Sequence, residues 1–169
     1  LHALWKADYH KDQAWGLCSV NNLTDFLTES NKIEGIKRGP TVAELVETER
    51  FLRLSTVSQF DLMALVSVYQ PDAKLRDALG MNVRVGDYIA PLGGSNIPRI
   101  LGGILAKANG SGYTAHHVHH EYERLHPFTD GNGRSGRALW LWMMRQREDG
   151  APLGFLHHFY YQSLAEGRP

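Results

Sequence analysis

The 169-residue sequence has almost no cysteine, no net charge and no long apolar run. Cys18 is its only cysteine, which excludes an internal disulfide framework and favours a reducing compartment. Eighteen basic side chains balance eighteen acidic ones, so no net field attracts the molecule to nucleic acid or to an anionic membrane. The longest apolar stretch, residues 138–144, is far shorter than the ~20 residues of a membrane-spanning helix. We therefore expect a soluble, cytoplasmic protein whose anion sites are local.

Internal repeats and low-complexity tracts are also absent. A chain of this length with 43% hydrophobic residues is typical of one compact domain with its own core. Proline and glycine are spread between segments of helical length, where they separate one element from the next. We expect a single domain that spans residues 1–169.

Apolar periodicity and helix start signals predict that most of the chain is helical. Thr41 with Glu44 and Ser58 with Asp61 have the spacing of capping boxes, each of which opens a helix. The expected helices cover residues 19–30, 41–54, 58–70, 98–107, 113–125, 134–147 and 154–165.

Residues 81–98 are the only part of the sequence with the pattern of strands. A hairpin is predicted because β-prone residues stand on both sides of a Gly-Asp pair at 86–87. These β-prone residues are Val83, Val85, Tyr88 and Ile89. The expected fold is therefore mainly α, a helical bundle with one small β-hairpin.

Residues 126–137 concentrate functional side chains between two predicted helices, in the order His-Pro-Phe-Thr-Asp-Gly-Asn-Gly-Arg-Ser-Gly-Arg. Pro127 disfavours the α conformation at His126, so the preceding helix should end there and hold the imidazole in place. The next helix should start between Gly131 and Arg134. Its first N–H groups lack intrahelical partners, and glycine lets a phosphate approach them.

The charged side chains of this segment suit a polyphosphate with its metal ion. Arg134 and Arg137 are three residues apart, so they should share a face near the positive end of the predicted helix, an arrangement that an anion would stabilise. Asp130 can bind Mg²⁺, which usually takes one or two protein carboxylates together with phosphates and water. His126 can act as general base toward a hydroxyl, because imidazole titrates near neutral pH. Phosphoryl or nucleotidyl transfer is therefore expected.

Residues 126–137 resemble the signature of the Fic family, His-x-Phe-x-Asp/Glu-Gly-Asn-Gly-Arg-x-x-Arg, at every defined position. The resemblance implies a protein adenylyltransferase, which transfers AMP from Mg-ATP to a Ser, Thr or Tyr hydroxyl of a target protein and releases pyrophosphate. It implies that His126 is the catalytic base, that Asp130 binds Mg²⁺ and that Arg137 binds the γ-phosphate. The ATP phosphates would contact Gly131, Asn132, Gly133, Arg134 and Arg137.

The predicted hairpin lies where the Fic family places a flap that holds a target peptide by strand addition. By this resemblance the flap covers about residues 82–92. Its implied target-binding residues are Val83, Arg84, Val85, Tyr88 and Ile89.

Residues 30–35, Ser-Asn-Lys-Ile-Glu-Gly, resemble the inhibitory motif of the family, Ser/Thr-x-x-x-Glu-Gly/Asn. Ser30, Glu34 and Gly35 occupy its defined positions. A carboxylate at Glu34 that paired with Arg137 would compete with the γ-phosphate for the same guanidinium. The resemblance thus divides the domain into an inhibitory helix region, residues 1–40, and a catalytic core, residues 41–169, and it implies autoinhibition.

Other interpretations of the same residues stay open. Glu34 could orient a water that removes AMP from a modified protein, the donor could carry another nucleotide or phosphoryl group, or the chain could be a regulator that binds nucleotide without turnover. The spacing of His116 and His120 fits a zinc pair, although packing roles are favoured for these histidines and a supporting role for His119. The expected partner is a protein substrate, without direct nucleic-acid or membrane binding, and a homodimer stays open.

Overall fold

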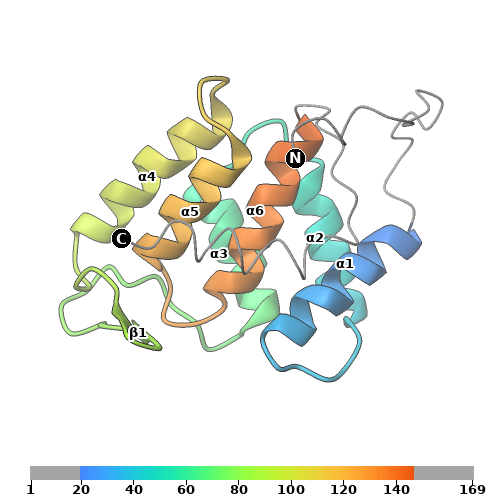
Figure 1. Ribbon diagram of the computed structural model, residues 1–169, viewed down its shortest axis with the longest axis horizontal. Helices are drawn as coiled ribbons and strands as arrows, with labels where there is room; N and C mark the ends of the chain where they lie inside the picture. The colour runs from blue at the N-terminus through green and yellow to red at the C-terminus, as the bar shows by residue number, and fades with distance from the viewer. Residues whose placement is uncertain (1–19, 147–169) are drawn as a thin grey trace, which may run out of the picture.

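The computed structural model describes residues 20–146, so the helix predicted at residues 154–165 lies outside the described part. Within that part the fold is mainly helical, with one two-stranded antiparallel hairpin, as the sequence predicts (Figure 1). No helix of the described residues is long and apolar enough to cross a bilayer. The elements in chain order are α1 (Val20–Ile33), α2 (Val42–Leu52), α3 (Gln59–Tyr69), β1 (Arg84–Val85), β2 (Tyr88–Ile89), α4 (Asn96–Asn109), α5 (Ala115–Leu125) and α6 (Asn132–Gln146).

Helices α2 and α3 start at the two predicted capping boxes. Thr41 Oγ1 accepts a hydrogen bond from Glu44 N at 3.2 Å, and the Glu44 carboxylate accepts one from Thr41 N at 2.7 Å. Ser58 and Asp61 make the same reciprocal pair at the start of α3. Each cap satisfies helix N–H groups that would otherwise lack partners and stabilises its helix by about 1 kcal/mol.

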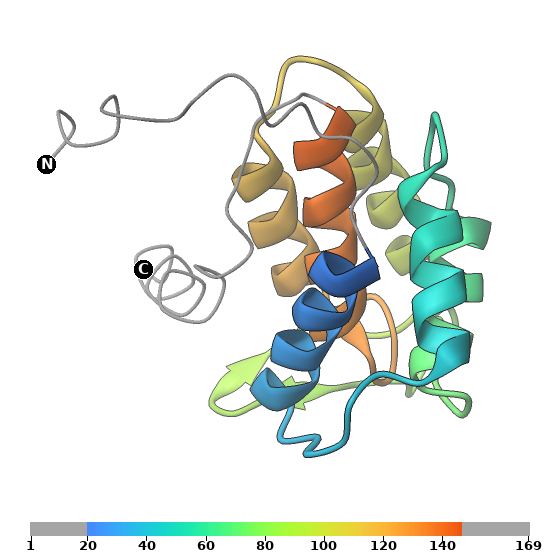
Figure 2. The same ribbon diagram turned by 90° about the vertical axis from the view of Figure 1, so that its right-hand side faces the viewer.

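Helix α6 lies at the centre of the bundle and packs against α1, α2, α3 and α5. Figure 2 shows it between α5 and α2. Its apolar side chains, including Leu139, Trp142 and Met143, are buried in the core. The indole N–H of Trp142 donates to Leu54 O at 2.8 Å, so this large side chain is buried without an unsatisfied polar group. The residues at the start of α6 are therefore held by four neighbouring helices.

The hairpin forms where the sequence predicts it. Arg84 pairs with Ile89 and Val85 with Tyr88, and Gly86 in the turn has φ 59°, a conformation that favours glycine. Val83 lies just before β1, and its carbonyl accepts a hydrogen bond from Ala90 N at 3.3 Å. All four strand residues are exposed.

A second pairing, which the sequence does not predict, joins the segment before the hairpin to the loop after α5. Residues 74–76 and 127–129 form an antiparallel bridge centred on Leu75 and Phe128. Two flanking backbone hydrogen bonds, both of 2.9 Å, extend it. The loop that carries the Fic-like motif is thus fixed to the chain that leads into the hairpin.

Candidate active site

His126 ends α5 in a left-handed conformation, with φ 51° and ψ 62°. Within residues 20–146 it is the one non-glycine residue with positive φ. Pro127 excludes a further turn of helix at this position, as expected, and the backbone N–H of His126 closes α5 on Tyr122 O at 2.9 Å. Such a conformation costs about 1–2 kcal/mol for a residue with a side chain, so the surrounding contacts must hold it in place.

The imidazole of His126 is oriented by the last turn of α5. Its Nδ1 lies 3.3 Å from Glu123 O. Because a carbonyl oxygen only accepts, the proton is on Nδ1 and Nε2 carries the free lone pair.

Burial lowers the pKa of His126 below its ordinary value of 6.5, and the positive charge of Arg76 lowers it further. The negative charges of Glu34 and Asp130 act in the opposite direction without reversing the result. The ring is therefore neutral at pH 7 and can accept a proton at Nε2.

The loop between α5 and α6 is folded by Asn132 and Gly131. The Asn132 side chain accepts from Phe128 N and donates to Phe128 O, both at 2.8 Å. Gly131 has φ 77°, and a Cβ there would be 3.4 Å from Gln70 Cβ. The Asn132 amide thus holds the turn, which leaves the backbone N–H groups at the start of α6 as the predicted contacts for phosphate.

Asp130 is exposed, and its Oδ1 accepts a hydrogen bond from Gly131 N at 2.6 Å. The described residues hold no cluster of three or more His, Cys, Asp or Glu side chains of the kind that binds a metal by itself. A single carboxylate beside an anion-binding turn nevertheless fits Mg²⁺, which takes most of its ligands from phosphates and water. Asp130 is the residue that would hold this ion.

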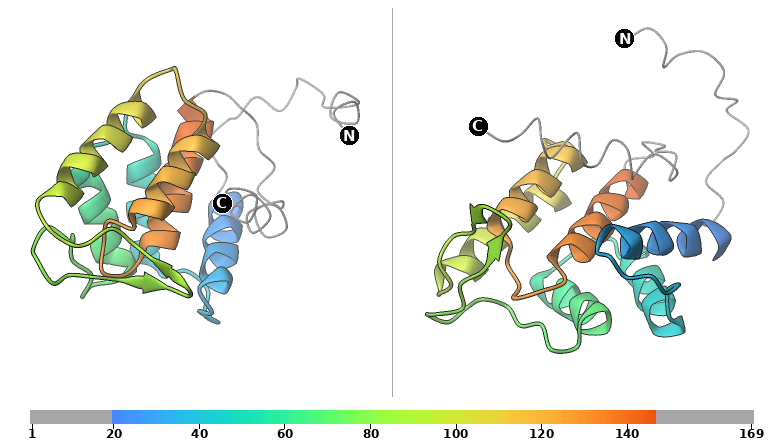
Figure 3. Two further views of the ribbon diagram at one scale, coloured as in Figure 1. Left: turned by 60° about the vertical axis from the view of Figure 1, so that its left-hand side comes forward. Right: turned by 60° about the horizontal axis from the view of Figure 1, so that its bottom comes forward.

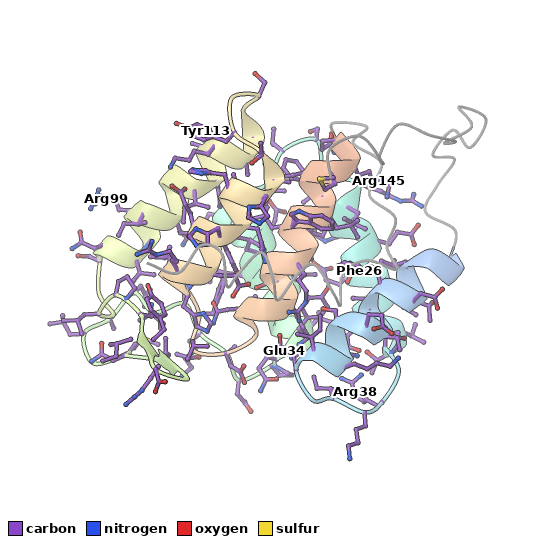
Figure 4. All side chains as sticks on the ribbon, in the orientation of Figure 1. Phe26, Glu34, Arg38, Arg99, Tyr113 and Arg145 are labelled. Atoms are coloured by element: carbon purple, nitrogen blue, oxygen red, sulfur yellow. The ribbon has the colours of Figure 1, made fainter. Side chains whose placement is uncertain are left out.

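Arg137 is 1% exposed, and its guanidinium is bound by the end of α1. Its Nε donates to Ser30 Oγ at 2.8 Å, and its Nη2 donates to Ser30 O at 3.0 Å and to Glu34 Oε1 at 2.6 Å. The contact between Glu34 and Arg137 that the resemblance implies is therefore present in the structure. Figure 4 shows Glu34 between the end of α1 and the start of α6.

The Glu34 carboxylate also covers Gly133, in the first turn of α6. A Cβ built on Gly133 would clash with Glu34 Oε1 and would lie 3.1 Å from Arg137 Nη1. Gly35 follows with φ 74° and turns the chain away, with its N–H bonded to Lys32 O at 3.0 Å. A negative group thus occupies the position where the sequence predicts a phosphate.

Arg134 is arranged differently from the shared face that its spacing to Arg137 predicts. It is 4% exposed, its Nη1 lies 3.4 Å from Glu44 Oε1, and its Nη2 donates to Gln70 Oε1 at 3.2 Å. The guanidinium also lies over the Tyr69 ring, 5.3 Å from the centroid. The polar contacts of Arg134 are therefore with α2 and with the end of α3, because the buried Glu44 attracts its charge. Its role as a phosphate ligand stays a prediction.

Two residues are important for the site through distant contacts that the sequence does not signal. Arg76, in the loop after α3, is completely buried and donates to the carbonyls of Leu125 and His126 at the end of α5. Glu44 binds Arg38 through both carboxylate oxygens, at 2.7 and 2.8 Å, as well as Arg134. A capping box predicts the local bonds of Glu44, but no local pattern predicts these distant partners.

His119 packs between α5 and α6, and burial lowers its pKa to about 3. It is therefore a neutral packing residue at pH 7, in line with the supporting role expected for it. His116 is exposed, and no metal cluster of the described residues includes it or His120.

Gly136 is expected to be required for the contact of α5 with α6. A Cβ there would clash with Glu123 Oε1 and would lie 2.9 Å from Tyr122 Cδ1 and 3.2 Å from His119 Cε1. We expect Gly136→Ala to destabilise the fold by about 1–3 kcal/mol in urea unfolding, because overpacking outweighs the gain in helix propensity. Gly102→Ala on α4 is the control, because a Cβ at Gly102 meets no atom within 4 Å. Equal stability of the two variants would contradict the close packing.

Comparison with known families agrees with the motif. Residues 88–144 match the model of the Fic/DOC family, a range that runs from β2 into α6 and includes α4, α5 and the loop between α5 and α6. Helices α1, α2 and α3 lie outside the matched residues. No curated protein matches the chain. The family match over residues 88–144 and the helical fold with its hairpin together support a Fic domain in this chain.

Proposed function

We propose that this chain transfers AMP from Mg-ATP to a hydroxyl group of a target protein, and that Glu34 inhibits the transfer. One observation carries the proposal. The Glu34 carboxylate, bound to Arg137 at 2.6 Å, occupies the first turn of α6, at the opposite end of the same loop from the neutral His126. An anion-binding turn and a base are thus presented by one short segment, as nucleotidyl transfer requires.

The chemistry assigned to each residue follows from its position. The hydroxyl oxygen of the target forms a bond to the α-phosphorus of ATP, the bond from this phosphorus to the bridging oxygen of the β-phosphate breaks, and pyrophosphate leaves. His126 Nε2 takes the hydroxyl proton, while the N–H groups at the start of α6 and Arg137 bind the phosphates. Mg²⁺, held by Asp130, would neutralise phosphate charge.

Transfer is tested with ATP labelled separately at the α- and γ-phosphates. We use Glu34→Gly, the parent, and a lysate as the source of target protein. Label on protein from α-labelled ATP, with none from γ-labelled ATP, supports AMP transfer. Protein label from γ-labelled ATP alone indicates a kinase and contradicts the proposal. Absence of label from both leaves nucleotide binding without turnover as the better description.

Asp130→Asn in the Glu34→Gly background is expected to lower transfer at least about tenfold and to raise the Mg²⁺ concentration needed for half-maximal rate, because an amide binds Mg²⁺ more weakly than a carboxylate. The measurement is the initial rate against Mg²⁺ at fixed ATP. Asp72→Asn is the control, since Asp72 is exposed and lies outside the motif. An unchanged Mg²⁺ dependence in Asp130→Asn would remove Asp130 from the metal site.

Removal of AMP from a modified protein is a second candidate. The carboxylate of Glu34 is 38% exposed even while it binds Arg137, so it can reach a water molecule. Incubation of AMP-modified protein with the parent and with Glu34→Gly separates the two reactions. Release of AMP that requires Glu34 would support removal as a second activity.

A further inference from the structure

Arg76 is a completely buried arginine whose hydrogen bonds all go to backbone carbonyls. Among the described residues no carboxylate forms an ion pair with it. Burial of a guanidinium without a counter-charge is unfavourable, so the hydrogen bonds that it makes to backbone carbonyls must offset this cost. Its acceptors and distances are His126 O at 2.6 Å, Leu125 O at 2.7 Å, Pro91 O at 2.8 Å and Met81 O at 3.1 Å.

Two of these carbonyls belong to the end of α5. The last carbonyls of a helix lack intrahelical partners and form the negative end of its dipole, so a cation there is favourable. Nε and Nη2 of Arg76 satisfy His126 and Leu125, which fixes the left-handed turn at His126. The backbone from which the imidazole projects is thus held by Arg76.

The other two carbonyls belong to the base of the hairpin. Met81 and Pro91 stand just outside its two arms, and both accept from Nη1 of Arg76. Gly93 packs tightly here, since a Cβ would be 2.6 Å from Met81 O and 2.8 Å from Ala78 O. Both views of Figure 3 place the hairpin next to the end of α5.

Further bonds join the same two regions. Tyr88 in β2 donates its hydroxyl hydrogen to Arg124 O at 2.8 Å. The backbone of Arg76 donates to Pro127 O and accepts from Gly94 N, both at 2.9 Å. A displacement of the hairpin base therefore acts directly on the residues around His126.

We propose that Arg76 is a positioning residue that couples the hairpin to His126, so that a target segment seated on the hairpin and the base that deprotonates it keep a fixed relation. The inference rests on the proposed function, because it takes His126 as the base. It adds a residue outside the Fic-like motif and outside the range that matches the family. A rigid tie of this kind matters because an error of about 1 Å in the position of a reacting group can lower a rate about 100-fold.

The test uses four changes in the Glu34→Gly background. Arg76→Gln removes the charge and most of the donors, and Arg76→Lys keeps the charge without the planar fork. Gly93→Ala displaces the hairpin base, including the Met81 carbonyl that Arg76 binds, while the Arg76 side chain itself is retained. Arg99→Gln is the matched control, since Arg99 projects from the outer side of α4 (Figure 4).

We expect Arg76→Gln to lower kcat for label transfer about 10- to 100-fold and to raise KM for the target, with the Kd of Mg-ATP changed less than about twofold. Gly93→Ala should lower kcat in the same direction, and Arg76→Lys should restore it only in part. A merely structural role would weaken ATP binding together with kcat. Unchanged kcat and KM in both Arg76→Gln and Gly93→Ala would overturn the coupling.

Histidine resonances in NMR spectra give a readout that does not depend on turnover. Burial is the main cause that lowers the pKa of the His126 ring, and the nearby charges of Arg76, Glu34 and Asp130 act on it as well, of which Glu34 is absent in this background. The pKa should rise in Arg76→Gln and stay in place in Arg76→Lys. If Glu34→Gly itself transfers no label, the proposed function fails, and the NMR spectra still decide the inference. Changed resonances of the His126 ring in Gly93→Ala, where the charge of Arg76 is kept, support the coupling, and unchanged resonances in both Arg76→Gln and Gly93→Ala overturn it.

Folding of each variant is checked by circular dichroism. Should Arg76→Gln fail to fold, the separate effects of Arg76→Lys and Gly93→Ala on kcat and on KM test the coupling instead. Loss of kcat at unchanged Kd for Mg-ATP in these variants supports the coupling, and parent-like kcat in both overturns it.

Discussion

Replacement of Glu34 by glycine is expected to raise AMP transfer about 10- to 100-fold at subsaturating ATP. A hydrogen bond to a charged group contributes about 1.5–3 kcal/mol, and each 1.4 kcal/mol corresponds to a factor of ten. The Glu34 side chain is 38% exposed, so solvent screening favours the lower end of this range. The measurement is the initial rate of transfer as a function of ATP concentration.

The change should act on the anion site without releasing α1. Leu23, Phe26 and Leu27 of α1 are at most 5% exposed, and Ser30 still binds Arg137 through its hydroxyl and carbonyl oxygens. The helix thus stays docked when the carboxylate is removed. The rate increase therefore reports competition for Arg137 and for the space above Gly133.

Two further variants separate charge from other effects. Glu34→Gln keeps the size and a hydrogen-bond acceptor but loses the charge, so its increase should be smaller than that of Glu34→Gly. Glu29→Gln on the same helix is the control, because Glu29 pairs with Lys32 at the surface and not with Arg137. Equal rates of Glu34→Gly and the parent at every ATP concentration would remove the inhibitory role from Glu34.

The elements that local sequence rules govern could be predicted. Helix starts at Thr41 and Ser58, the end of α5 before Pro127 and the turn at Gly86 all depend on residues within four positions of one another. Capping, the restriction before proline and the need for positive φ are local effects. The resemblance to the Fic motif then placed the candidate base and the anion-binding turn on these elements.

The contacts that could not be predicted join residues far apart in the chain. Spacing alone put Arg134 and Arg137 on one helix face, but Glu44 on α2 and Glu34 at the end of α1 attract them to different neighbours. The burial of Arg76 depends on four carbonyls from three separate segments. No periodicity or capping signal predicts contacts of this kind, because tertiary packing determines which distant residues come together.

His126→Ala in the Glu34→Gly background is expected to lower transfer by about 100- to 10,000-fold, the usual contribution of a general base. Mg-ATP should still bind, because the turn and Arg137 are unchanged, and titration calorimetry measures this. His116→Ala is the matched control, since His116 is an exposed histidine of the same helix. Transfer within a few-fold of the background rate in His126→Ala would show that another group takes the proton.

The left-handed backbone at His126 calls for a second variant. Alanine at this position is disfavoured by about 1–2 kcal/mol, so part of the loss could come from a displaced loop. Asparagine tolerates the conformation but supplies no base at neutral pH. A comparable loss in His126→Asn assigns the effect to the imidazole, whereas near-background activity in His126→Asn assigns it to the backbone.

The pH dependence of the transfer rate tests whether His126 is the group that takes the proton. The active form is the neutral imidazole, and burial, with Arg76, holds the pKa of His126 below 6.5. The rate in the Glu34→Gly background should therefore be level near pH 7 and should fall as the pH is lowered through this depressed pKa. Because the charge of Glu34 raises the pKa of His126, the fall in the Glu34→Gly background should lie at lower pH than the fall in the parent. The residual rate of His126→Asn should lack this fall, and its persistence there would place the titrating group elsewhere.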